Sequence, residues 1–283
     1  MGAKPRFSGI GVSLGLILAL ALVSSFEGQS AASTDATTAP TQTDPLAGLS
    51  PENRELFDRL REAAQQNDDA TTLATGKKLL PALEPGTPVC NFVTQLTAGS
   101  AVETGETAYA LTLLKPFTDA HPDDWRAATL LARVYAESGE VAPRDQQIAR
   151  VIALHKTASD PNFAKLHVFP IQKVKLHSGY AVFLYPFEPL KPYNTYLVAL
   201  VYTSEGKPDF RLELGSEDAD QAFFKPKKPG ERRFSIDSYR KNEKDENLPE
   251  SQALHGFVDG VFDYDRMRDL MVKAANGEAL TQK

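Results

Sequence analysis

Apolar residues follow two different patterns along this chain of 283 residues. Between about residues 51 and 158 they recur on one helical face, as in "WRAATLLARVYAESGE". After Asp160-Pro161 the runs become shorter and rich in Val, Phe, Tyr and Leu, as in "GYAVFLYPF" and "NTYLVALVYTS". Several of these runs alternate between apolar and polar residues, which is typical of strands. The pattern predicts helices in the first part and strands in the second.

The strands are expected to form an antiparallel sheet, because no helix-length segment separates them. A last amphipathic helix is predicted from about Tyr264 to Ala275, with Met267, Leu270 and Met271 on one face. The predicted fold class is therefore α+β. Helical hairpins over residues 51–158 precede an antiparallel β domain with a closing helix over residues 162–283.

The first residues have the pattern of a secretory signal. Lys4 and Arg6 precede an apolar run from Ile10 to Val23, which is short for a membrane span of about 20 residues. Residues 1–32 are predicted to be a cleaved signal peptide, the alternative being a retained membrane anchor. Residues 33–50 are mostly Ser, Thr, Ala and Pro, and are predicted to be a disordered linker. We therefore expect a periplasmic or secreted protein that contacts the membrane only through an uncleaved N-terminal segment.

The helical part repeats with a period of 34 residues, the distance from Pro88 to Pro122. Three units can be aligned from Phe57, Asn91 and Trp125. Four aligned positions then hold small, turn-forming or apolar residues in every unit: Ala64, Ala98 and Ala132; Thr71, Gly105 and Gly139; Leu80, Leu114 and Ile148; Leu83, Phe117 and Val151. The alternative interpretation is a general helical bundle with accidental spacing.

The third unit, with Ala128, Leu131, Ala132, Tyr135 and Gly139, resembles the tetratricopeptide (TPR) repeat. The resemblance covers about residues 51–158, and it is imperfect. Ala101 and Asn67 replace the tyrosine that the TPR pattern expects, while Gly76 and Arg144 replace its alanine.

TPR arrays line a groove with the first helix of each pair, and the groove binds peptides or partner domains without catalysis. The resemblance places Asp58, Phe92, Gly99 and six further polar residues in this groove: Arg61, Gln65, Gln95, Arg126, Thr129 and Arg133. Arginines here would pair with carboxylates of an extended peptide. The Lys and Asn set that clamps C-terminal carboxylates in some arrays is missing, and a structural role for the six side chains is an open alternative.

Charge and motifs exclude several other functions. The formal net charge of -6 argues against nucleic acid, which is bound by clustered Lys and Arg. The chain has no phosphate-binding or dinucleotide-binding glycine motif, no Cys-x-x-Cys pair and no nucleophile elbow. Its one cysteine, Cys90, is expected to be a small buried apolar residue. We expect a non-enzymatic protein without cofactor or metal.

Two clusters offer alternatives. His255, Asp259, Asp263 and Asp265 are possible ligands of a divalent cation, which would indicate a metal-dependent hydrolase. A turn at Asp259-Gly260 followed by carboxylates at a helix start is the interpretation that we favour. The basic run Lys225–Arg233 is interpreted as a solvated hairpin loop, the alternative being attraction to an anionic surface.

The sequence thus favours an exported, non-catalytic scaffold or adaptor that binds a protein or peptide partner in a bacterial cell envelope. A second hypothesis assigns the function to the β domain, as a module for a small ligand or carbohydrate. Its aromatic residues would then line one face of the sheet: Tyr180, Tyr185, Tyr193 and Tyr196.

Overall fold

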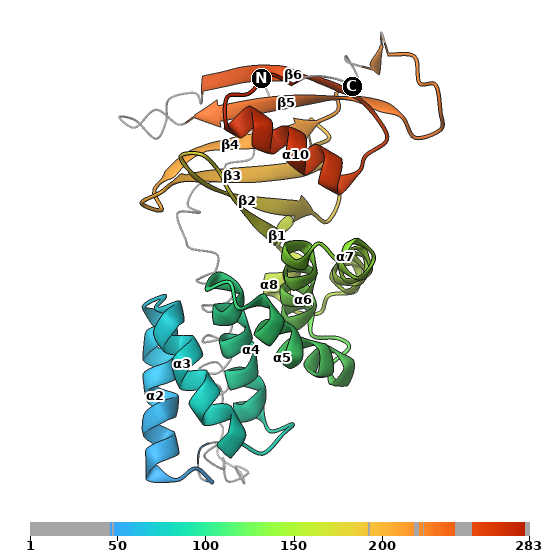
Figure 1. Cartoon of the computed structure of the whole chain (residues 1–283). Coiled ribbons are helices and arrows are strands. Elements are labelled where there is room, and N and C mark those ends of the chain that lie inside the picture. Colours follow the sequence, from blue (N-terminus) through green and yellow to red (C-terminus); the bar gives the residue numbers. More distant parts are fainter. Residues whose placement is uncertain are drawn as a thin grey trace, which may run out of the picture. The chain divides into compact units, whose positions relative to one another are not determined.

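A computed structural model describes residues 46, 48–191, 193–217, 221–222, 224–240 and 251–280. The predicted signal peptide and nearly all of the predicted linker lie outside these residues. The chain divides into two compact units, with the division between Val151 and Ile152 (Figure 1). We describe each unit by itself. In the described part of the chain, no helix is long and apolar enough to cross a membrane.

The helical unit is a succession of helices in which each one from α2 to α5 packs against the next. The helices are α2 (Pro51–Gln65), α3 (Asp69–Leu79), α4 (Pro88–Glu103), α5 (Thr107–Ala120), α6 (Trp125–Ser138) and α7 (Val141–Lys156), with a short 3-10 helix η1 (Leu80–Ala82) after α3. The division between the two units falls inside α7.

Polar side chains fix where the helices begin. Ser50 accepts a hydrogen bond from the backbone N–H of Asn53, and Pro51 follows it in the first turn of α2. Thr87 caps α4 in the same way, at 3.2 Å from the backbone nitrogen of Cys90. Asp124 accepts from the first backbone N–H groups of α6 at 2.9 Å. These caps satisfy groups that helix starts otherwise leave without partners.

The helix pairs turn at three residues with positive φ: Asn67 (56°), Gly105 (80°) and Gly139 (74°). Gly105 and Gly139 are the predicted turn residues, whereas the predicted Thr71 lies inside α3. The 34-residue alignment therefore places the turn of the first unit four residues too late in the sequence. When positions are counted from the turn residues, equivalent positions are buried in all three units: Leu60, Ala98 and Ala132, then Leu79, Phe117 and Val151.

The helical unit has two apolar clusters. One joins α2, α3 and α4, where the rings of Phe57 and Phe92 lie 5.8 Å apart between their centroids. The other joins α4, α5 and α6 around Leu114 and Leu131. Helices α3 and α4 are in close contact at Gly76, where a Cβ would lie 1.9 Å from Oγ1 of Thr97. Glycine suits this contact. Counted from the turn residues, Thr72 and not Gly76 stands at the position of Ala110 and Arg144.

The second unit contains a six-stranded antiparallel sheet in the order β1-β2-β3-β4-β5-β6, so each strand pairs with its neighbours in sequence (Figure 1). A short helix α8 (Pro161–Ala164) precedes it. The strands are β1 (Val168–Lys175), β2 (Gly179–Pro186), β3 (Leu197–Thr203), β4 (Pro208–Gly215), β5 (Arg232–Arg240) and β6 (Ser251–Gly260). The predicted α+β fold class, with antiparallel strands after the helices, is confirmed.

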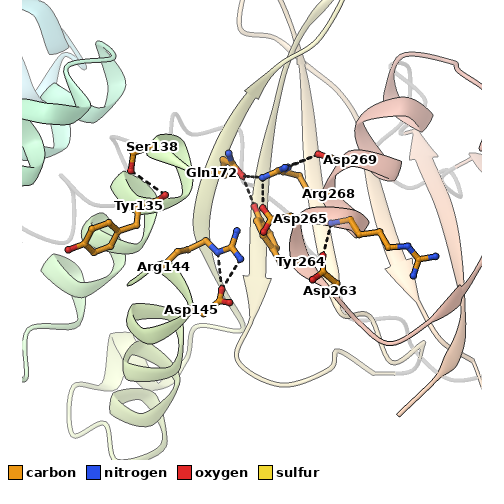
Figure 2. A network of polar contacts seen from close by, with 11 residues as sticks. Tyr135, Ser138, Arg144, Asp145, Gln172, Asp263, Tyr264, Asp265, Arg268 and Asp269 are labelled. Carbon is orange, nitrogen blue, oxygen red and sulfur yellow. Dashed lines mark hydrogen bonds and ion pairs between the residues drawn. The ribbon is translucent and has the colours of Figure 1, made fainter. Parts of the chain in front are cut away.

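Helix α10 (Tyr264–Ala275) lies across one face of the sheet (Figure 1). Its Met267 and Met271 are fully buried, as are Phe183, Leu212 and other inward residues of the strands. The helix is also held to β1 by polar contacts, because Tyr264 and Arg268 both donate hydrogen bonds to Oε1 of Gln172, at 3.0 and 3.1 Å (Figure 2). The closing helix predicted from the sequence is therefore part of the core of this unit.

Candidate functional site

The six predicted groove residues come from the three first helices of the pairs. Arg61 and Gln65 lie on α2, Gln95 lies on α4, and the other three lie on α6. Helix α4 packs against α6, and Phe57 of α2 contacts Phe92 of α4. The three helices therefore lie side by side in the order α2-α4-α6, and they form the face that we call the α2-α4-α6 face.

Arg133 is inside the helical unit, with only 1% of its surface exposed. Its Nη1 atom lies 2.9 Å from Oε1 of Glu103 on α4, and its Nη2 atom lies 3.6 Å from Oε1 of Glu137 on α6. The two carboxylates balance the charge of the guanidinium from within the unit. Arg133 therefore links α4 to α6, and its position does not suit the predicted role of pairing with a partner.

Gln95 and Thr129 also lie between helices. Gln95 is 6% exposed, and its Nε2 atom donates to Oδ2 of Asp124 at 2.5 Å. Thr129 is 1% exposed and donates from its hydroxyl to the backbone carbonyl of Trp125, one helical turn earlier. Both side chains therefore serve the contact between α4 and α6 or the helix itself, and a partner cannot reach them without disturbing the packing.

The other three predicted residues are accessible. Arg61 forms an exposed ion pair with Asp58, at 3.5 Å between Nη2 and Oδ1, and such a surface pair holds the guanidinium only weakly. Gln65 is exposed. Arg126 is partly exposed, and its guanidinium lies over the ring of Trp125 at 4.6 Å from the centroid. The aromatic contact orients this cation.

Gly99 occupies the middle of the face. It lies six residues before its turn residue, the same position as Arg61 in the first unit and Arg133 in the third. A Cβ built at Gly99 would have no heavy atom within 4 Å, apart from its own chain neighbours and helix backbone. The backbone of α4 is therefore open to solvent at this point. The sequence places Gly99 on this face, but it does not show that the space above it is empty.

Polar contacts also join neighbouring repeat units at other positions along the helices. Oγ of Ser100 donates to Oδ1 of Asp69 at 2.9 Å, and Nζ of Lys77 donates to Oε2 of Glu106 at 2.5 Å. The two members of each pair are about 30 residues apart in sequence, so each pair spans adjacent units. The side chains near the helix junctions are thus used for stacking, which leaves Arg61, Gln65, Gly99 and Arg126 as the accessible part of the face.

The tyrosines of the second hypothesis do not line one face of the sheet. Tyr180 stacks on Tyr202 at 5.1 Å between centroids, and the pair belongs to the face opposite α10. Tyr185 and Tyr196 instead contact Phe262, which directly precedes α10. These tyrosines are split between the two faces, so the predicted aromatic face is wrong.

The four possible metal ligands have separate structural roles. Asp259 accepts two hydrogen bonds from Arg233, at 2.7 and 2.8 Å, and this hydrogen-bonded guanidinium holds the pKa of Asp259 below its usual value. Asp263 caps α10, and Asp265 pairs with Arg268 at 2.7 Å (Figure 2). His255 is the extra residue of a β-bulge in β6. The described residues contain no group of three or more His, Cys, Asp or Glu that could hold a metal ion.

In comparisons with known proteins, no protein-family model, no curated protein and no solved structure matches this chain.

Proposed function

We propose that this protein is a non-catalytic adaptor of the cell envelope whose helical unit binds an extended segment of a protein partner along the α2-α4-α6 face. The observation that supports this function best is the open backbone at Gly99 on α4, the middle helix of a face that also carries the accessible Arg61 on α2 and Arg126 on α6. A bare helix backbone on a face with cations is a position where another chain can approach closely.

The dimensions of the face suit an extended peptide. Packed helices are about 8–10 Å apart, so the distance from α2 to α6 across α4 is roughly 16–20 Å. An extended chain advances about 3.3 Å per residue, and about five or six residues would cross the face. Such a segment would pass over Gly99 at its middle.

The two arginines of the face favour partner segments that carry acidic residues. Arg61 and Arg126 would each pair with a carboxylate, and guanidinium groups form two parallel hydrogen bonds with such a group. The partner segment would therefore carry an acidic residue near each end. Arg133 contributes indirectly, because its contact with Glu103 holds α6 beside α4.

The experiment is capture of partners from a native envelope extract by the chain from residue 33, which keeps every described residue. We expect one partner at a constant ratio, and its loss when Gly99→Trp fills the open space above α4. The double variant Arg61→Glu/Arg126→Glu is expected to lose the partner for electrostatic reasons.

Two matched variants make the same kinds of change elsewhere. Ala70→Trp adds the same ring at an exposed position of α3. Lys78→Glu/Lys115→Glu reverses two exposed charges, on α3 and α5. Both are expected to keep the partner. Capture profiles that Gly99→Trp leaves unchanged would count directly against the proposed face.

A further inference from the structure

The loop before β5, together with the first two residues of β5, concentrates positive charge on a protein that is negative overall. Residues 225–233 contain five basic residues and one glutamate, a net charge of +4, whereas the whole chain has -6. Four of the basic side chains are exposed: Lys225, Lys227, Lys228 and Arg232. This loop is the orange segment that projects beyond the ends of β5 and β6 in Figure 1.

The loop has a defined shape. The carboxylate of Glu231 accepts hydrogen bonds from the backbone N–H groups of Lys227 and Lys228, at 2.5 and 3.1 Å. Gly230 allows the turn with its φ of 81°. The only acid of the loop therefore binds its backbone, while Arg233 pairs with Asp259. Across the described ranges, no ion pair involves the four exposed cations.

Apolar surface lies beside these cations. Arg232 pairs with Gly260 in the sheet, and the next residue, Val261, is 50% exposed. Pro226 and Pro229 are exposed within the loop. We call Lys225, Lys227, Lys228, Arg232 and Val261 the basic end of the second unit. Exposed cations together with an exposed apolar side chain are the combination that binds anionic membrane interfaces.

We propose that the basic end docks on an anionic phospholipid surface. The cations would be attracted by the headgroup phosphates, and Val261 with the two prolines would enter the interface between headgroups and acyl chains. A soluble acidic polypeptide could attract the same cations, but it would not use Val261. The contribution of this apolar side chain therefore distinguishes the two kinds of partner.

The test is sedimentation of the chain from residue 33 with vesicles, because this chain lacks the apolar run at residues 10–23. We expect binding to vesicles that contain phosphatidylglycerol, no binding to phosphatidylcholine alone, and weaker binding as salt is added. Each basic residue near such a surface changes the affinity by about fivefold, so Lys225→Glu/Lys227→Glu/Lys228→Glu should weaken it by about 100-fold or more.

The matched control is Lys156→Glu/Lys165→Glu/Lys175→Glu, which makes the same change of net charge at exposed lysines of the same unit. It is expected to lose much less affinity. Equal binding by the control and the loop variant would contradict the proposal. Failure of the unaltered chain to bind phosphatidylglycerol vesicles would also contradict it.

A second pair of measurements separates a membrane from an acidic polypeptide. Val261→Asp is expected to weaken vesicle binding while leaving any binding to soluble polyglutamate unchanged. Val261→Trp should show a blue-shifted emission on phosphatidylglycerol vesicles beyond that of Trp125, the only tryptophan of the chain. If polyglutamate binds as tightly as the vesicles and Val261→Asp changes neither, the surface recognises acidic polypeptides and the proposal is wrong.

Discussion

The guanidinium of Arg133 on α6 lies 2.9 Å from the carboxylate of Glu103 on α4, with the arginine 1% and the glutamate 10% exposed. This contact separates two roles that the sequence could not separate. Arg133 maintains the arrangement of the helices, whereas Arg61 and Arg126 are accessible for binding.

The first prediction concerns this ion pair. Arg133→Ala is expected to lower the free energy of unfolding by about 3–5 kcal/mol, because Glu103 would remain buried without its cation. Denaturant unfolding followed by circular dichroism measures the change. Arg61→Ala, at an exposed pair, should change it by less than about 0.5 kcal/mol. The double variant Arg133→Met/Glu103→Leu should recover most of the loss, and no recovery would mean that the pair acts in another way.

A second prediction compares two glycines in neighbouring helices. Gly76→Ala is expected to destabilise the helical unit by about 1–3 kcal/mol, because the new Cβ would overlap Oγ1 of Thr97. Gly99→Ala should stabilise it by about 1 kcal/mol, since alanine is the better helix former and the space is open. Thermal unfolding measures both changes. Shifts of the same sign would contradict the packing described for α3 and α4.

The third prediction concerns acid stability. The pKa of Asp259 is lowered in the folded protein, so its ion pair with Arg233 stabilises the fold above the ordinary value of 3.8. This contribution is lost as the pH falls through the lowered folded-state pKa. Asp259→Asn should therefore cost at most about 1 kcal/mol at neutral pH, because both side chains are one-third exposed. The cost should disappear in strong acid.

Urea unfolding of both proteins at the two pH values gives this comparison. Asp209→Asn, in an exposed pair with Arg240, serves as the control and should have little effect at either pH. A cost of Asp259→Asn that persists in strong acid would show that the carboxylate charge is not its source.

The sequence predicted the class of each unit because hydrophobic periodicity is a local property. It misplaced the first repeat by four residues for a physical reason. Four residues are close to one helical turn of 3.6, so the shift keeps the same residues on the buried face. The turn residue could have settled the register, but Asn67 takes the left-handed conformation where the other units have glycine.

Long-range contacts explain why the candidate site was predicted only in part. The burial of Arg133 depends on Glu103, which is 30 residues away and invisible to any local pattern. The favoured interpretation of the His255 cluster was right about the helix start, because Asp263 caps α10. It was wrong about a turn at Asp259-Gly260, because both residues pair with β5 at the end of β6. Gly99 was expected to face the groove, but the empty space above it depends on the surrounding helices.

Binding of the captured partner to Gly99→Trp is the sharpest test of the α2-α4-α6 face. We expect a folded protein whose melting temperature is at least that of the unaltered chain, and whose affinity for the partner is at least about 100-fold lower. A loss of about 100-fold corresponds to about 2.7 kcal/mol. An unchanged affinity in a folded Gly99→Trp variant would show that the partner does not lie on the α2-α4-α6 face.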